Sequence, residues 1–255
     1  MVSCDPALVQ RLERAEASAN AAFVEARAQV EPAVGACWLE VAGTSALFDG
    51  VGSPLTQTFG LGLIEPVEAP TFAALEAFFS ARGASTSHEV AASASAAVTR
   101  QLLARCYQAI EHSTVWARAT TAVGDRPPSA IGVRRVEADE VERWALVSGE
   151  GWSDVGAAVS EFIVQFGRVM AHARGVVLFL AELDAKPIAA AALNLQADVA
   201  LLAGASTLPS ARGNGAQRAL LDARLAYAAA QGIELAMLVT QPEGASARNA
   251  ARAGF

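Results

Sequence analysis

The stretch LLAGASTLPSARGNGAQRALL, residues 201–221, decides how the rest of this sequence is interpreted. Its first residues are apolar and typical of a buried strand, which ends at Pro209. A turn that contains Gly213 and Gly215 follows, and an amphipathic helix begins directly after it. Glycines allow a tight turn, and the free N–H groups and dipole of a helix start attract an anion. The pattern predicts a phosphate cradle, although an ordinary strand-turn-helix connection has the same pattern.

The segments around this stretch alternate between strand and helix patterns. After it we expect a helix over 215–231, ended by Gly232, then a strand over 233–240 and a helix over 245–253. Before it, the residue patterns predict a strand over 131–136, helices over 139–148 and 157–173, and strands over 176–183, 186–196 and 199–208.

The first half of the chain has a similar order. Its residue patterns predict a helix over 5–31, strands over 36–41 and 56–63, a helix from Pro70 to Gly83, a strand over 86–91, a helix over 95–107 and a strand over 112–119. The order strand, helix, strand, helix over residues 59–107 repeats over residues 203–255, which indicates an internal duplication. Paired prolines at 127 and 128 place the boundary between two domains, 1–126 and 127–255.

Composition excludes several classes of protein. Of the 255 residues 53% are hydrophobic and 18% are charged, which is enough to bury a core and excludes disorder. The net charge of −7 is unfavourable for binding nucleic acid or an anionic membrane. Cys4, Cys37 and Cys106 are odd in number and widely spaced, so we expect neither a disulfide framework nor a metal site. No apolar run is long enough to span a bilayer, and we expect a soluble, cytoplasmic protein.

Two signatures resemble the GNAT superfamily of acyl-CoA-dependent N-acyltransferases. The first, R/Q-x-x-G-x-G/A after a strand that ends in V-x-P, is similar to residues 212–217 after residues 207–209. The second, a short helix that ends in Gly-Phe after an apolar strand, is similar to residues 246–255. The resemblance implies an α/β (α+β) fold with two GNAT-like domains in tandem, each a mixed central sheet flanked by helices. Residues 1–126 would be a degenerate copy, and residues 127–255 would bind acetyl-CoA.

The resemblance also implies a set of cofactor-binding residues. Backbone groups at the end of the strand would bind the pantetheine arm, the amides of the turn would hold the pyrophosphate with Arg212 beside it, and Asn249 would add a polar contact. These residues are Ser206, Thr207, Leu208, Arg212, Gly213, Asn214, Gly215, Ala216, Gln217 and Asn249.

The sequence departs from the family pattern at three positions. Gln217 stands where Gly or Ala is usual, which is tolerable if its side chain faces solvent or the phosphate. Glu243 replaces an Asn that contacts the pantetheine arm, and Ala250 replaces the Tyr that protonates the leaving thiolate. Asn249 could supply a polar contact but no general acid.

No catalytic residue is identified from the sequence. Glu150 and Glu161 lie near or in helices that border the acceptor site in such folds, but a solvated surface carboxylate is the commoner role for such residues. The tyrosines at 107 and 227 are expected to be core residues, so the departing thiolate would depend on water or electrostatics.

The resemblance implies an acetyl-CoA-dependent N-acetyltransferase that acts on a small-molecule or peptide amine, without a metal. The alternative is a non-catalytic GNAT-like protein that binds coenzyme A, another nucleotide-type ligand or a protein partner. The sequence does not define the acceptor, and it leaves open whether the chain forms a homodimer.

The second half lacks one element of the first. It stops at Phe255, about one strand or hairpin earlier than the first half does. We therefore expect further chain, a segment of the first half or another subunit to cover the exposed sheet edge.

Overall fold

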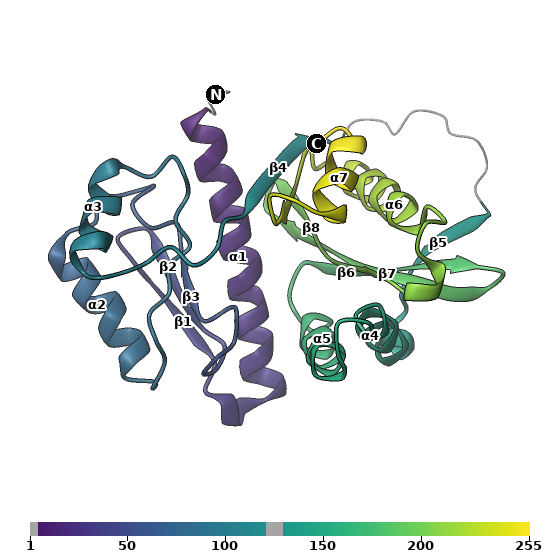
Figure 1. The fold of residues 1–255 in the computed structure, drawn as a ribbon, viewed down its shortest axis with the longest axis horizontal. Helices are drawn as coiled ribbons and strands as arrows, with labels where there is room; N and C mark the ends of the chain where they lie inside the picture. The colour runs from purple at the N-terminus through teal and green to yellow at the C-terminus, as the bar shows by residue number, and fades with distance from the viewer. Residues whose placement is uncertain (1–4, 121–129) are drawn as a thin grey trace. The chain divides into compact units, whose positions relative to one another are not determined.

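A computed structural model describes residues 5–120 and 130–255 of this chain. The chain divides into two compact units, Met1–Glu111 and His112–Phe255, each of which combines a β-sheet with helices (Figure 1). None of the helices in the described ranges combines the length and the apolar character needed to cross a membrane.

The N-terminal unit contains a three-stranded antiparallel sheet in the order β1-β2-β3. Phe72 and Leu75 of one helix pack against Ala46 and Phe48 of the middle strand and form its core. The elements are α1 (Pro6–Val30), the 3-10 helix η1 (Pro32–Val34), β1 (Cys37–Val41), β2 (Thr44–Phe48), β3 (Gln57–Phe59), α2 (Ala69–Ser80) and α3 (Ala96–Ala104).

Two differences from the expected N-terminal elements have a backbone cause. Ala42 and Gly43 have φ values of 49° and 66°, which make a two-residue hairpin turn and create β2, a strand that the sequence did not predict. The strand expected over 56–63 ends at Phe59 because Gly60 turns the chain at a φ of 80°. The strand expected over 86–91 is a single parallel bridge from His88 to β3.

The C-terminal unit is built on a six-stranded mixed sheet in the order β4-β9-β8-β7-β6-β5. All neighbours are antiparallel except β8 and β9, which run parallel. The elements are β4 (Thr114–Ala119), β5 (Ile131–Arg135), η2 (Ala138–Glu140), α4 (Val141–Glu150), α5 (Ala157–Met170), β6 (Val176–Leu183), β7 (Lys186–Gln196), β8 (Val199–Thr207), η3 (Pro209–Ala211), α6 (Ala216–Ala230), β9 (Leu235–Thr240) and α7 (Ala245–Arg252). From Ile131 onward these elements confirm the expected order.

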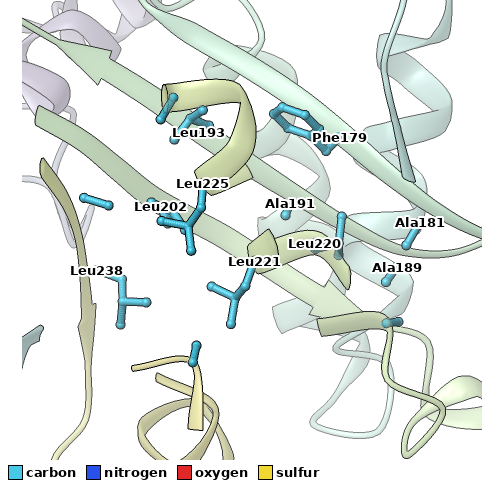
Figure 2. Close-up of a cluster of buried hydrophobic side chains, with 14 of the residues drawn as sticks. Phe179, Ala181, Ala189, Ala191, Leu193, Leu202, Leu220, Leu221, Leu225 and Leu238 are labelled. Carbon is cyan, nitrogen blue, oxygen red and sulfur yellow. The ribbon is translucent and has the colours of Figure 1, made fainter. Parts of the chain in front are cut away.

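Alternate residues of the central strands face opposite layers of helices, because side chains of a strand alternate between its two faces. On one face Leu180 and Ala190 pack against Trp144 of α4. On the other face the strands pack against α6 and α7. Figure 2 shows the labelled members of this second cluster, which are Phe179, Ala181, Ala189, Ala191, Leu193, Leu202 and Leu238 from the sheet and Leu220, Leu221 and Leu225 from α6.

The sheet edge beside β9 is covered by β4. The two strands are antiparallel in continuous register from Thr114, opposite Thr240, to Ala119, opposite Leu235. Trp116 adds a side-chain bond, because its Nε1 donates to Thr240 Oγ1 at 2.9 Å. A segment expected in the first half thus covers this edge, which is one of the three alternatives expected from the sequence.

This pairing also determines where the compact units divide. The expected boundary between residues 126 and 127 lies outside the described residues, which omit 121–129. The units divide between Glu111 and His112 because β4 belongs to the C-terminal sheet.

The expected repeat of element order is visible in the two units. β3, α2, the bridge at His88 and α3 follow one another in the N-terminal unit, as β8, α6, β9 and α7 do in the C-terminal unit. In both cases the two extended segments that flank the longer helix are parallel neighbours. Both α/β units therefore share this late part of the fold.

Candidate functional site

The second half of β8 has a strand neighbour on one side only. β8 pairs with β9 from Val199 to Leu201, opposite residues 235–237, whereas residues 238–240 of β9 are registered with β4 only. On its other side β8 remains paired with β7 as far as Thr207. We call residues 202–207 the unpaired stretch, because their backbone has no registered partner on the β9 side. An extended ligand can bind such a strand through backbone hydrogen bonds.

A β-bulge lies within the unpaired stretch. β7 has one residue, Ala191, where β8 has two, Gly204 and Ala205, between registered pairs. Gly204 has a φ of 57°, a conformation that glycine adopts without strain. Bulges redirect a strand locally and are common beside active sites.

The expected anion cradle follows the unpaired stretch. After β8 and η3, residues 212–215 form a turn in which Gly213 and Gly215 have φ values of 85° and 89°. A Cβ added to either glycine would have no neighbour within 4 Å, so both the conformation and the space around it are open. In the described structure no protein atom accepts a hydrogen bond from the backbone N–H groups of residues 213–218. These consecutive free donors at the N-terminus of α6 fit an anionic group with several oxygens.

Thr207, at the end of β8, directs its backbone groups toward this site. Leu208 donates its N–H to Ile188 O at 2.9 Å and so forms a hydrogen-bonded pair with β7. Because antiparallel pairs alternate, the N–H and C=O of Thr207 point away from β7, toward the unpaired side. Ser206 is held by a bond from its Oγ to Ser148 O at 2.9 Å.

Arg212 makes contacts that the sequence did not predict. Its guanidinium donates to both carboxylate oxygens of Asp154, at 2.6 and 2.9 Å, and to Gly151 O at 2.8 Å. These hydrogen bonds hold the pKa of the Asp154 carboxyl below its usual value. Arg212 thus ties the turn to the α4–α5 connection, and its expected contact with a pyrophosphate stays a prediction.

The α4–α5 connection lies directly against the end of β8. A Cβ at Gly151 would lie 2.7 Å from Ser206 Cβ and 3.1 Å from the amide nitrogen of Thr207. Only glycine fits this close approach without displacing a neighbour.

The half-buried side chain of Gln217 bonds to the end of β8. Its Nε2 donates to Thr207 Oγ1 at 2.8 Å, which links the first turn of α6 to the end of β8. The other turn residues, 212–215, are exposed, and Asn214 donates its side-chain amide to Ala211 O at 3.2 Å.

Asn249, the last of the expected cofactor-binding residues, lies on helix α7. Asn249 is half-buried, and its side-chain oxygen accepts a bond from Arg252 Nη2 at 2.5 Å. Ala250 is buried in the core against the sheet, and Glu243 is exposed. The position of the family's acid thus holds an apolar side chain that packs and transfers no proton.

The carboxylates considered for the acceptor side lie on the surface. A groove of about 470 Å³ between α4 and α5 is lined by Glu161, Leu146, Val164 and Arg168, among others. Glu150 is exposed at the end of α4. Tyr227 packs its ring against Phe179, and Tyr107 packs against His88 in the N-terminal unit.

Three site residues were missed by sequence reasoning, namely Gly151, Asp154 and Arg224. Gly151 and Asp154 are brought to β8 by tertiary packing, and no local pattern marks them. Arg224 has a signal, because it occupies the apolar face of α6 between Leu220 and Leu225.

Comparison with known proteins first defines the class of fold. A GCN5-related N-acetyltransferase from Kribbella flavida superposes with a TM-score of 0.57 at 21% identity, over 88% of this chain and 87% of its own. A tandem GNAT protein from the clavulanic acid biosynthesis pathway superposes with a TM-score of 0.55 at 15% identity, over 82% of this chain and 73% of its own. The fold is thus that of GNAT proteins, including one of tandem form.

A sequence match covers the C-terminal part of the chain. The family model of the acetyltransferase (GNAT) family matches residues 139–255. No curated protein sequence gives a significant match. Residues 139–255 therefore match the GNAT acetyltransferase family, and the fold of the chain is that of GNAT proteins.

Proposed function

We propose that this protein is an acetyl-CoA-dependent N-acetyltransferase that transfers an acetyl group directly to an amine. The observation that carries the proposal is the run of free backbone N–H groups at residues 213–218, next to the unpaired stretch of β8. The anion-binding turn suits the pyrophosphate of coenzyme A, and the open edge of β8, which precedes the turn in the chain, suits the pantetheine arm. The match of residues 139–255 to the acetyltransferase family supports this proposal.

Different residues would bind different parts of the cofactor. Amides of residues 213–217 would hold the pyrophosphate, because they are free donors at a helix N-terminus. The pantetheine arm would lie along Ser206, Thr207 and Leu208 and bind the backbone groups of Thr207, which point away from β7, and Asn249 would add a polar contact from α7. When bound, acetyl-CoA supplies the acetyl group as an activated thioester.

The chain's own groups account for part of the transfer step. As the amine nitrogen bonds to the acetyl carbon, the carbon–sulfur bond breaks and the nitrogen loses a proton. A backbone N–H of the unpaired stretch of β8 would donate to the acetyl oxygen. The buried methyl group of Ala250 donates no proton to the sulfur, so thiolate departure depends on water or on the surrounding charges.

We assign cofactor binding to the C-terminal unit alone. The corresponding turn of the N-terminal unit follows β3, and there the N–H of Gly60 already donates to the Glu13 carboxylate at 2.8 Å. The carboxyl group of Glu13 thus accepts from the donor that a phosphate would need. The acceptor is a small-molecule or peptide amine, and we propose no role for nucleic acid or membrane.

A second candidate function is binding without catalysis. Ala250, 1% exposed and part of the core, favours it because the family's acid is absent. Such a protein would bind coenzyme A or a similar nucleotide-type ligand and would not turn over.

Two measurements on the purified chain separate these functions. Calorimetry with coenzyme A tests binding, and release of free thiol from acetyl-CoA in the presence of a panel of amines tests transfer. Binding together with amine-dependent thiol release supports the enzyme. Binding without thiol release supports the second candidate, and absence of binding up to millimolar coenzyme A excludes the enzyme and a coenzyme A-binding form of the second candidate.

A further inference from the structure

The guanidinium of Arg224 is buried, and among the described residues it donates to backbone carbonyls only. The residue is 1% exposed on the sheet-facing side of α6. Its Nε donates to Leu220 O at 3.1 Å, and its Nη1 donates to Ala192 O at 2.9 Å and to Ala203 O at 3.2 Å. Among the described residues no carboxylate pairs with it.

Such a charge is expensive to bury. Removal from water costs a cation several kcal/mol, and an acidic partner normally offsets part of that cost. Here burial alone lowers the pKa of Arg224 to about 9. The neighbours on the same face of the helix, Leu220, Leu221 and Leu225, show that an aliphatic residue suits this environment. We therefore expect the hydrogen bonds of Arg224 to have a function that offsets the cost of burying its charge.

The carbonyls that Arg224 binds flank the β-bulge. Ala192 and Ala203 are the registered pair next to the position where one residue of β7 faces two of β8. A bulge interrupts the ladder and leaves backbone groups that need other partners. Ala203 is also the second residue beyond Leu201, the last residue of β8 that pairs with β9. Arg224 thus holds β8 where it separates from β9.

Gln217 holds the other end of the same stretch. It lies seven residues before Arg224, which is two helical turns and about 10 Å along the axis. It binds Thr207, four residues beyond Ala203 and about 13 Å away along an extended strand. The two spans are comparable, so α6 fixes β8 near both ends of the unpaired stretch.

We propose that Arg224 and Gln217 are positioning residues, which act through β8 to keep the unpaired stretch apart from β9 so that the acyl thioester arm can lie along it. This inference rests on the proposed function and deepens it. Because residues 213–218 adjoin Thr207, the arm would enter at the end held by Gln217. Its acyl end would lie toward the bulge, at the end held by Arg224.

The two positions should therefore affect different kinetic constants. In Arg224→Met, which preserves apolar packing and removes the donors, we expect kcat to fall at least tenfold, while the calorimetric Kd for coenzyme A changes by less than threefold. In Gln217→Ala we expect the Kd and the KM for acetyl-CoA to rise about fivefold to tenfold, with a smaller change in kcat. Arg224→Lys keeps one donor and should recover part of the lost kcat.

Leu225→Ala provides the matched control. Leu225 is fully buried on the same helix, and its side chain donates no bond to β8. Its loss should lower the melting temperature and leave both constants of the folded protein near wild type.

The outcomes are distinguishable. Wild-type kcat and Kd in both variants would overturn the inference. So would losses in Arg224→Met that match those in Leu225→Ala at an equal fraction of folded protein, because that result indicates a purely structural role. If Arg224→Met does not fold, Arg224→Lys and Gln217→Ala decide by the same criteria. If the wild-type chain binds no coenzyme A, the proposed function fails first and this inference fails with it.

Discussion

Proline substitutions in β4 test whether this strand completes the C-terminal sheet. Thr120 donates its N–H to Glu234 O at 2.9 Å, which marks a hydrogen-bonded pair with the start of β9. Because an antiparallel edge strand alternates, the N–H of Arg118 points toward β9 and that of Ala117 points away from the sheet. Arg118→Pro therefore removes a ladder bond, whereas Ala117→Pro removes none.

The expected losses follow from the partners. Arg118→Pro removes a bond worth about 1 kcal/mol and leaves the carbonyl of Ala236 without a donor, which costs a further 1–3 kcal/mol or so. Ala236 is fully buried, so water does not replace the donor. The side chain of Arg118 also donates to Ala253 O, and Arg118→Ala controls for its loss. We expect Arg118→Pro to be about 2–4 kcal/mol less stable than Arg118→Ala, and Ala117→Pro to stay within about 1 kcal/mol of wild type.

Urea denaturation and thermal melting of the full chain, followed by circular dichroism, measure these differences. At about 2–4 °C per kcal/mol for a chain of this size, the gap between Arg118→Pro and Arg118→Ala is about 4–16 °C. Equal losses in the two proline variants would refute the register of β4 on β9. If Arg118→Pro and Arg118→Ala have the same melting temperature, β4 contributes nothing to the stability of the sheet and its pairing with β9 is wrong.

Three further predictions concern other parts of the chain. Gly151→Val should lower the unfolding free energy by about 1–3 kcal/mol in urea, because its Cβ would meet Ser206 Cβ at 2.7 Å; an unchanged value would contradict this close approach. Trp144→Phe removes an indole donor shared by two strand carbonyls, at 3.1 and 3.3 Å, and should cost about 1–3 kcal/mol, whereas the exposed Trp152→Phe should cost less than about 0.5. Burial raises the pKa of Glu89 to about 7, so the folded chain keeps a proton that the unfolded chain releases above about pH 4.3. Wild type should therefore lose stability relative to Glu89→Gln as pH rises from about 5 to 7, and a constant difference would exclude this effect.

The C-terminal elements were predictable because their signals are local. The apolar spacing of α6 and the glycine that follows it defined that helix, and the apolar runs of β6–β9 defined the strands. The turn at residues 212–215 was predictable for the same reason, since the need for positive φ is expressed in the glycines themselves.

The pairing of β4 and the contacts of Arg212 and Arg224 could not be predicted, because they depend on residues distant in the sequence. Residues 112–119 were expected to form a strand of the first half, but no local pattern shows which sheet edge a strand joins, and β4 pairs with β9 of the C-terminal sheet. Arg212 was expected to face a phosphate, yet its carboxylate partner lies 58 residues earlier in the chain. The role of Arg224 depends on a bulge between two other strands, which the spacing of α6 does not reveal.

The most direct test of the cofactor site compares aspartate at the two ends of α6. Gly215 and Gly232 have φ values of 89° and 76°, and a Cβ at either has no neighbour within 4 Å. Gly215→Asp and Gly232→Asp therefore introduce the same charge with similar backbone strain, and only the first lies in the phosphate turn.

Calorimetric titration of coenzyme A into both variants and wild type provides the measurement. Two like charges about 5 Å apart repel by about 3 kcal/mol at an effective dielectric constant near 20, which is more than the 1.4 or so needed for a tenfold loss. We predict that Gly232→Asp binds like wild type and that Gly215→Asp binds at least about tenfold more weakly. Equal affinity in the two variants would contradict the claim that residues 213–218 hold coenzyme A.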